Sequence, residues 1–248
     1  MKLIGVSEQF LVLLGRENND QIHRHYDIQL QIPTSSMIIN GKRTTDQVLI
    51  DSNVKHITSF ADGDMLSFLI HPESRIGQNI RRHYFKSDRI ATAHLPGLVE
   101  QIKVIYESMA DLNRLKRVTH TILDRFIIDT SDLQQLDDRV TDMLNCIHSA
   151  DLAHLQLADV LNSVHLSKSR LTHLFKNEMK ISVMRYMTWT RLFRAAQSLV
   201  FSNASITATA HQFGFADASH FSRVFKESFG YCPKRLVQEK KTTVSFMF

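Results

Sequence analysis

The chain has 248 residues, of which 43% are hydrophobic and 22% are charged. This composition is typical of a globular protein with one large or two ordinary domains, and it excludes a disordered or fibrous chain. The formal net charge is +5, and from residue 151 onward 13 Lys and Arg stand against 6 Asp and Glu. A basic C-terminal part favours a partner that is rich in phosphates.

Near the start, the longest apolar run is Phe10–Leu14. It is too short for a membrane span or a secretory signal, so we expect a cytoplasmic protein with no membrane partner. Cys146 and Cys232 are too few to build a structural zinc site, and no CxxC occurs. We therefore expect no cofactor.

Short strands are predicted over residues 7–75. Apolar and polar residues alternate in Ile28–Ile32, and turn residues such as Asn40-Gly41 and Asp62-Gly63 separate the runs. This spacing predicts an antiparallel sandwich or small barrel. We assign residues 1–95 to a sensory or regulatory β domain.

Residues 96–128 change to helical periodicity and predict a pair of amphipathic helices after Pro96-Gly97. Two roles stay open for this pair: packing against the sheet, or forming a dimer interface. The polar residues 129–137 are interpreted as a linker. Residues 138–238 are predicted to be mostly helical, and 239–248 to be a tail.

The strongest pattern is an internal repeat at an offset of 50 residues. Leu171–Lys176 aligns with Phe221–Lys226, and both segments carry apolar residues at helical spacing and end in Phe-Lys. Each follows a helix-starting residue, Ser167 or Asp217, and a shorter helical run upstream. A helix, a tight turn and a capped second helix form a helix-turn-helix. One long helix, Val183–Phe201, is predicted to join the two units.

These residues resemble the AraC/XylS family of transcription regulators. The resemblance covers about 100 residues and rests on Arg191–Val200, Ile206, Ala210–Lys226, Phe229-Gly230 and Pro233. It implies sequence-specific promoter binding, usually as an activator that contacts RNA polymerase. The second helix of each helix-turn-helix could then enter one of two successive major grooves, about 34 Å apart.

The expected DNA contacts lie on the faces of the second helices that point away from their apolar stripes. The resemblance implies base reading at Ser169, Thr172 and His173 in the first unit, and at Ala218, Ser219, Ser222 and Arg223 in the second. The candidate phosphate contacts are Lys168, Arg170, Lys176, Arg194 and Lys226. For Arg223, bidentate reading of a guanine competes with a phosphate contact and with an ion pair to Glu227.

The first unit departs from the family pattern. His165 stands where its turn usually has glycine, Lys180 replaces a second glycine, and Val183 replaces a proline. Glycine suits a left-handed backbone better than these residues do. We therefore expect the second unit to keep the common geometry more closely than the first.

Residues 20–80 are similar to the cupin-like sensory arm found in many members of this family. His23 and His25 have the spacing of the first two cupin metal ligands, and His56 could be the third histidine. Gln29 occupies the expected carboxylate position and brings no charge. We expect His23, His25 and His56 to line an effector site without a metal or to have a structural role. Metal binding stays geometrically open because His23 and His25 share a strand face.

The predicted fold class is α+β: an N-terminal antiparallel, cupin-like β-barrel with two helices, and a C-terminal all-α domain of two joined helix-turn-helix units. The predicted function is a nucleoid-associated regulator whose partners are promoter DNA and RNA polymerase, with a small effector and a homodimer left open. No catalytic residue is expected. The alternatives are a metal-dependent cupin enzyme with an added helical domain, and a protein that coats chromosomes without sequence preference.

Overall fold

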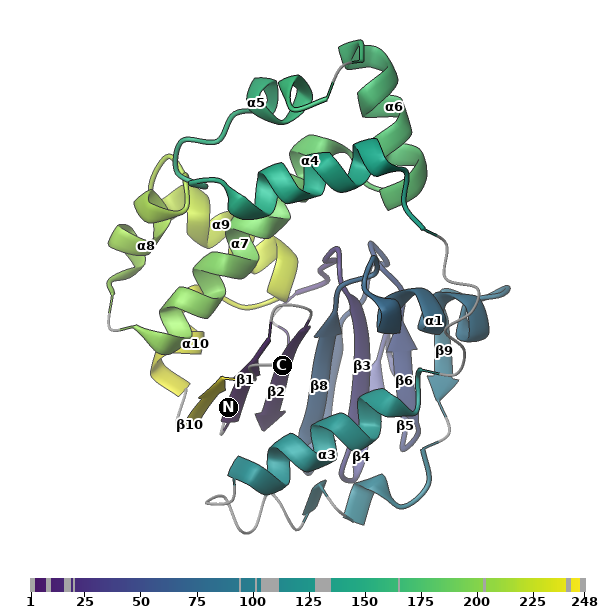
Figure 1. Ribbon diagram of the computed structural model, residues 1–248. Coiled ribbons are helices and arrows are strands. Elements are labelled where there is room, and N and C mark those ends of the chain that lie inside the picture. The colour runs from purple at the N-terminus through teal and green to yellow at the C-terminus, as the bar shows by residue number, and fades with distance from the viewer. Residues whose placement is uncertain are drawn as a thin grey trace. The chain divides into compact units, whose positions relative to one another are not determined.

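The computed structural model describes the chain except for residues 1, 2, 8, 9, 16–18, 20, 94, 101, 104–111, 128–134, 165, 203, 240, 241 and 246–248. It divides into an N-terminal unit, Met1–Leu133 with Glu227–Tyr231 and Arg235–Phe248, and a C-terminal unit, Gln134–Lys226 with Cys232–Lys234. All the described strands lie in the first unit, and the second is helical (Figure 1). The predicted α+β class, with an antiparallel β part followed by an all-helical part, is confirmed.

The described strands of the N-terminal unit form two sheets. One has seven strands in the order β10-β1-β2-β8-β3-β6-β9 and is antiparallel except for the β1–β10 pair, and the other has the order β5-β4-β7. Their bounds are β1 Leu3–Val6, β2 Phe10–Gly15, β3 Ile28–Pro33, β4 Ser36–Ile39, β5 Lys42–Thr44, β6 Gln47–Ile50, β7 Thr58–Asp62, β8 Met65–Ile70, β9 Ile90–Ala93 and β10 Thr242–Ser245.

Strand β3 shows how the sequence pattern positions the two faces of the large sheet. Successive side chains of a strand point to opposite faces. Ile28, Leu30 and Ile32 enter one hydrophobic core, and the polar Gln29 and Gln31 occupy the other face, where they are also buried. The second face is thus a buried polar environment.

Helix α3, Leu112–Asp124, covers the apolar face of the sheet (Figure 1). Val118 and Ile122 lie in the same core cluster as the strand residues, and so does Phe126 just beyond the helix. Two roles were considered for this helix, packing against the sheet and forming a dimer interface. Its apolar side is used for packing against the sheet. The first helix predicted for 96–128 falls largely outside the described residues, and so does most of the predicted linker.

Helix α1, Arg75–Tyr84, lies inside the segment predicted to be a β domain. Ser74 caps it by accepting a hydrogen bond from Gly77 N at 3.1 Å, and Ile76 and Ile80 bury one side. The sequence pattern predicted no helix here. The signal was a capping serine followed by two isoleucines one helical turn apart.

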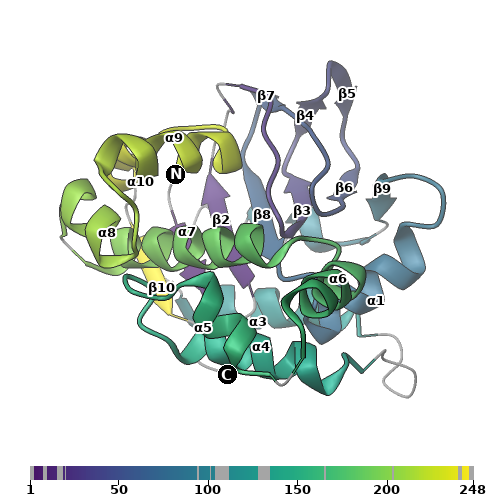
Figure 2. The same cartoon turned by 90° about the horizontal axis from the view of Figure 1, so that it is seen from above.

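The C-terminal part consists of helices in the order predicted from the repeat. Their bounds are α4 Asp138–Ser149, α5 Leu157–Asn162, α6 Lys168–Met179, α7 Val183–Phe201, α8 Ile206–Gln212, α9 Ala218–Phe229 and α10 Pro233–Glu239. The predicted joining helix is confirmed with the same bounds. Helix α7 contacts α6 and α8, and Figure 2 shows it as the long helix between them.

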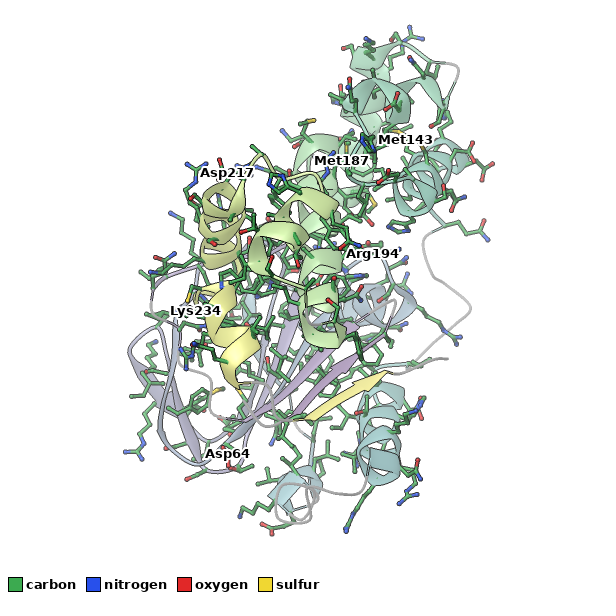
Figure 3. The ribbon with its side chains drawn as sticks, turned by 90° about the vertical axis from the view of Figure 1, so that its left-hand side faces the viewer. Asp64, Met143, Met187, Arg194, Asp217 and Lys234 are labelled. Carbon is green, nitrogen blue, oxygen red and sulfur yellow. The ribbon has the colours of Figure 1, made fainter. Side chains whose placement is uncertain are left out.

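Buried aromatic and aliphatic side chains hold the C-terminal unit together. Phe175 of α6 packs edge-on against Tyr186 of α7, with ring centroids 5.6 Å apart. The Tyr186 hydroxyl lies 2.9 Å from His148 Nε2 on α4. Met143 of α4 and Met187 of α7, both labelled in Figure 3, are buried, and these two helices contact each other. Helix α7 therefore forms the core against which the repeated pairs are built.

Candidate nucleic-acid interface

Helix α6 separates a buried stripe from an exposed polar face. Leu171, Phe175 and Met179 are buried at spacings of four residues. Ser167 is the N-cap residue, as predicted, although its side chain makes no capping hydrogen bond. All of the residues predicted to contact DNA on this helix are exposed: Lys168, Ser169, Arg170, Thr172, His173 and Lys176.

Two of these side chains are already hydrogen-bonded within α6. The Thr172 hydroxyl donates to the carbonyl oxygens of Lys168 and Ser169, each at 3.0 Å, so its methyl group and its acceptor lone pairs remain to meet a base. Asn177 Nδ2 lies 3.2 Å from His173 Nδ1. When Asn177 donates to Nδ1, the ring proton of neutral His173 sits on Nε2 and can donate to a base or a phosphate.

Helix α9 repeats the arrangement. Phe221 and Phe225 are fully buried, with ring centroids 5.7 Å apart, and Phe215 packs on Phe221 at 5.0 Å. Asp217 Oδ1 accepts a hydrogen bond from His220 N at 2.7 Å, and this backbone contact lowers the pKa of Asp217. Figure 3 shows Asp217 where α9 begins.

The predicted contact residues of α9 are less uniform in exposure than those of α6. Ser219 and Arg223 are exposed, whereas Ala218, Ser222 and Lys226 are half-buried. Among the described residues, no ion pair joins Arg223 to Glu227, so that alternative for Arg223 is not realised here. The guanidinium faces solvent and can approach a base edge or a phosphate.

Arg191 of α7 has a structural role that the sequence pattern did not reveal. Its Nε donates to the Leu152 carbonyl at 3.0 Å, and an Nη donates to the Leu155 carbonyl at 2.6 Å. Burial lowers the pKa of this arginine. Arg194, one turn further along α7, is exposed and lies on the same helix in Figure 3. Of these two arginines, only the exposed Arg194 is a phosphate candidate.

Gly214 lies in the turn between α8 and α9 and has a left-handed φ of +74°. A Cβ added there would come within 2.7 Å of the Leu152 carbonyl oxygen. The same carbonyl accepts the Arg191 hydrogen bond. This turn needs glycine both for its backbone conformation and for its close packing.

The structure describes two of the three positions at which the first helix-turn-helix departs from the family pattern. Lys180 ends α6 with φ +58°, the left-handed conformation that glycine adopts most easily. His165 lies outside the described residues. Val183 is buried as the first residue of α7, where Ser182 accepts a hydrogen bond from Arg185 N at 3.4 Å.

The N-terminal unit brings together the three histidines that the sequence singled out. His23, His25 and His56 are 4%, 4% and 1% exposed. One ring nitrogen of each lies within 4.8 Å of one ring nitrogen of both others. His23 and His56 exchange two backbone hydrogen bonds of 2.9 Å, which place the two chain segments side by side.

All three imidazoles are disfavoured in their protonated form. Burial, together with the neighbouring His56, lowers the pKa of His23 to about 3. Burial and the two other rings lower the pKa of His25, and burial lowers that of His56. At neutral pH this site therefore consists of uncharged rings.

A small cavity of about 10 Å³ adjoins the cluster, and its walls include His23, His25, Gln29 and Gln31. That is room for roughly one water-sized particle. Gln29 Nε2 donates to Ser67 Oγ at 3.1 Å, and its Oε1 lies 3.4 Å from His25 Nε2. Gln29 therefore stands beside the histidines, at the position where the cupin resemblance expects a carboxylate.

Comparison with known proteins gives matches to DNA-binding regulators. A family model described as a helix-turn-helix domain matches residues 160–239. The arabinose operon regulatory protein of Salmonella typhimurium is 31% identical over 159 residues, which are 60% of this chain and 55% of that protein. The transcriptional activator RhaS of Yersinia pestis is 39% identical over 61 residues, 25% of this chain and 22% of its own length.

Among solved structures, ToxT of Vibrio cholerae superimposes with a TM-score of 0.58 at 14% identity, covering 94% of this chain and 98% of that one. This likeness concerns the fold. The matched segments and the tandem helix pairs define a helix-turn-helix protein with an N-terminal β unit. In its C-terminal part the chain is similar to helix-turn-helix regulators such as the arabinose operon regulatory protein. It spans about half the length of the curated relatives it matches.

No helix among the described residues is both long and apolar enough to cross a membrane.

Proposed function

We propose that the protein is a sequence-specific DNA-binding transcription regulator that reads its site with helices α6 and α9. The observation that carries this proposal is the repeated, solvent-facing polar surface on two equivalent helices. On each helix the buried stripe packs against neighbouring helices. The opposite, polar face includes residues of the first helical turn. The N-terminal end of a recognition helix is the part that meets base edges in the major groove.

The proposed division of labour follows the contacts of each side chain. Ser169, Thr172 and His173 of α6, with Ala218, Ser219, Ser222 and Arg223 of α9, face the bases. Lys168, Arg170, Lys176, Arg194 and Lys226 contact phosphates and fix the register. Phosphate contacts position a protein on the duplex, whereas base contacts specify the sequence.

We further propose that the protein activates transcription by contacting RNA polymerase at the nucleoid, and that the N-terminal unit senses an effector or mediates homodimerisation. Support for activation comes from relatives such as the Yersinia pestis transcriptional activator. The apolar side of α3 is already packed on the sheet. A dimer through this helix would therefore use its outer, polar side.

The alternatives of a cupin enzyme and a chromosome-coating protein are less well supported. The reported relatives are transcription regulators, and the position expected for a metal-binding carboxylate holds Gln29. The coating hypothesis predicts binding without sequence preference. Footprinting with competitor DNA separates these alternatives, because protection by a specific regulator survives an excess of random duplex.

Arg223→Ala is the decisive variant, once the target has been selected from a randomised duplex library and compared with genome-wide bound sites. Losing a bidentate arginine–guanine contact costs about 1–3 kcal/mol at the matching base pair. We expect target binding to fall roughly 5- to 150-fold, while random-DNA binding falls much less. Arg185→Ala removes the same charge from an exposed position outside both reading faces and serves as the control.

Equal losses on target and random DNA would show that Arg223 only holds a phosphate. If the library yields no preferred sequence, the sequence-specific function itself is contradicted.

A further inference from the structure

We propose that His23, His25 and His56 together bind one divalent transition-metal ion, represented by zinc, inside the N-terminal unit. The inference stands apart from the DNA-binding function proposed for α6 and α9. It rests on four observations about these three side chains: their convergence, the direction of their ring protons, an unpartnered nitrogen and the size of the adjoining space.

The convergence brings three buried ligand atoms to one point. His23 and His25 are two residues apart, and their ring centroids lie 5.9 Å apart. The paired backbone hydrogen bonds between His23 and His56 bring the third ring beside them. The ring centroids are 4.2 Å apart for His23 and His56 and 5.2 Å for His25 and His56.

The ring protons all point away from the cluster. His25 Nδ1 lies 2.8 Å from the Asp27 carbonyl, His56 Nδ1 lies 2.9 Å from the Val54 carbonyl, and His23 Nδ1 lies 3.3 Å from the Gln21 carbonyl. A carbonyl oxygen only accepts, so each Nδ1 must carry the proton of its neutral ring. The lone pair then sits on each Nε2. Donation of the other ring nitrogen to a backbone carbonyl is the usual arrangement of metal-bound histidines.

The Nε2 atom of His56 lacks a donor to satisfy it. It is buried and has no hydrogen-bond partner among the described residues. A buried acceptor without a partner costs roughly 1–3 kcal/mol. A cation bound by the three rings would satisfy this nitrogen.

The donor set selects the kind of ion. Neutral imidazole nitrogens suit Zn²⁺, Cu²⁺ and Ni²⁺, whereas Mg²⁺ and Ca²⁺ prefer oxygen. In a tetrahedral site with Zn–N of about 2.0–2.1 Å, nitrogens lie about 3.3 Å apart. The ring nitrogens lie up to 4.8 Å apart, so a bound ion would draw them together by about 1.5 Å. The cavity of about 10 Å³ beside His23 and His25 has room for roughly one water-sized particle.

The test uses the full-length protein, stripped with a chelator and titrated with ZnCl₂ in a calorimeter. We expect one equivalent to bind with micromolar or tighter affinity and to raise Tm, and we expect Mg²⁺ to do neither. Electron paramagnetic resonance of the Cu²⁺-loaded wild-type protein should show three nitrogen ligands, and this measurement needs no variant. Absence of one-equivalent binding, or a copper spectrum without nitrogen ligands, would overturn the proposal.

Three variants locate the ion: His23→Asn, His25→Asn and His56→Asn. The asparagine amide can replace Nδ1 as donor to the backbone carbonyl while removing Nε2, so the chain segment keeps its hydrogen bond. Each should weaken zinc binding at least tenfold. His83→Ala, which removes an exposed histidine of α1, is the control and should bind as tightly as wild type. Unchanged binding in the three asparagine variants would place the metal elsewhere.

Discussion

Lys180 and Gly230 end equivalent helices fifty residues apart, and both adopt the left-handed backbone, with φ of +58° and +78°. In both repeats, the second helix of the pair thus ends with a residue in the left-handed conformation. Only the second repeat uses the residue that adopts this conformation without steric cost. The first repeat tolerates the strain because buried Ile181 and Val183 follow at once and anchor the chain.

Lys180→Gly should therefore stabilise the protein. A non-glycine residue in the left-handed region costs about 1 kcal/mol, and glycine removes that cost. The variant loses the hydrogen bond from Lys180 Nζ to the Asn177 carbonyl, which is exposed and adds little. We expect Tm to rise by a few degrees in differential scanning calorimetry. Lys176→Gly, the same change inside α6, should instead lose about 1 kcal/mol. Equal destabilisation by both changes would contradict the strain at Lys180.

Gly214→Ala should be strongly destabilising. The added Cβ meets both an unfavourable φ and the Leu152 carbonyl oxygen at 2.7 Å. We expect a loss of about 2 kcal/mol or more in urea unfolding. Gly41→Ala is a matched control, since Gly41 has φ +82° but nothing within 4 Å of the added Cβ. A loss at Gly214 no larger than at Gly41 would mean that the close packing in the helical turn has no energetic effect.

Arg191→Ala and Arg194→Ala should separate stability from DNA affinity. Removing Arg191 leaves the Leu152 and Leu155 carbonyls without their charged donor, at a cost of about 2 kcal/mol or more. Removing the exposed Arg194 should leave Tm unchanged and weaken binding to duplex DNA. Thermal unfolding and fluorescence anisotropy with labelled DNA measure the two effects. The assignment fails if Arg194→Ala unfolds the protein or Arg191→Ala does not.

Lys176→Ala should change the salt dependence of DNA binding. Each phosphate contact contributes about 0.9 to the slope of log affinity against log salt concentration. We therefore expect the slope to fall by about that amount for Lys176→Ala. Lys42→Ala, an exposed lysine of β5 in the other unit, should leave the slope unchanged. The same slope for wild type and Lys176→Ala would remove Lys176 from the phosphate contacts.

The metal-free protein should lose stability as the pH falls below about 6.5. In the unfolded chain, histidine binds a proton near pH 6.5, whereas folded His23 does so only near pH 3. Between these values the unfolded state holds more protons, so His23 alone lowers the free energy of unfolding by about 1.4 kcal/mol per pH unit. His23→Asn should flatten the dependence of Tm on pH between 6.5 and 4.5, while His83→Ala should not. A dependence that is unchanged in His23→Asn would exclude this histidine as its source.

The helical part was predictable because its signals are local. The repeat at an offset of 50, the apolar stripes of Leu171–Phe175 and Phe221–Phe225, and the capping Asp217 all appear within single helices. Arg191 looked like any arginine in a helix, because its role depends on carbonyls some forty residues earlier in the chain. Helix α1 was missed where a strand-rich pattern continued up to Ser74.

The histidine cluster was predictable only in part. The spacing of His23 and His25 indicates a shared face, which the structure confirms. The approach of His56 depends on pairing between two chain segments outside the regular strands, which no local period encodes. The direction of the three ring protons depends on the positions of backbone carbonyls, which no sequence pattern encodes.

Helix α7 limits how the protein can change by insertion. It is an unbroken α-helix of 19 residues, about 28 Å long at 1.5 Å per residue. One added residue would turn everything after it by about 100°, and the α8–α9 pair would then no longer face the same direction relative to α6. Substitutions on the outer side of α7 do not change the rotation of the α8–α9 pair relative to α6. We therefore expect chains that share this architecture to vary in the sequence of this helix but to hold its length constant.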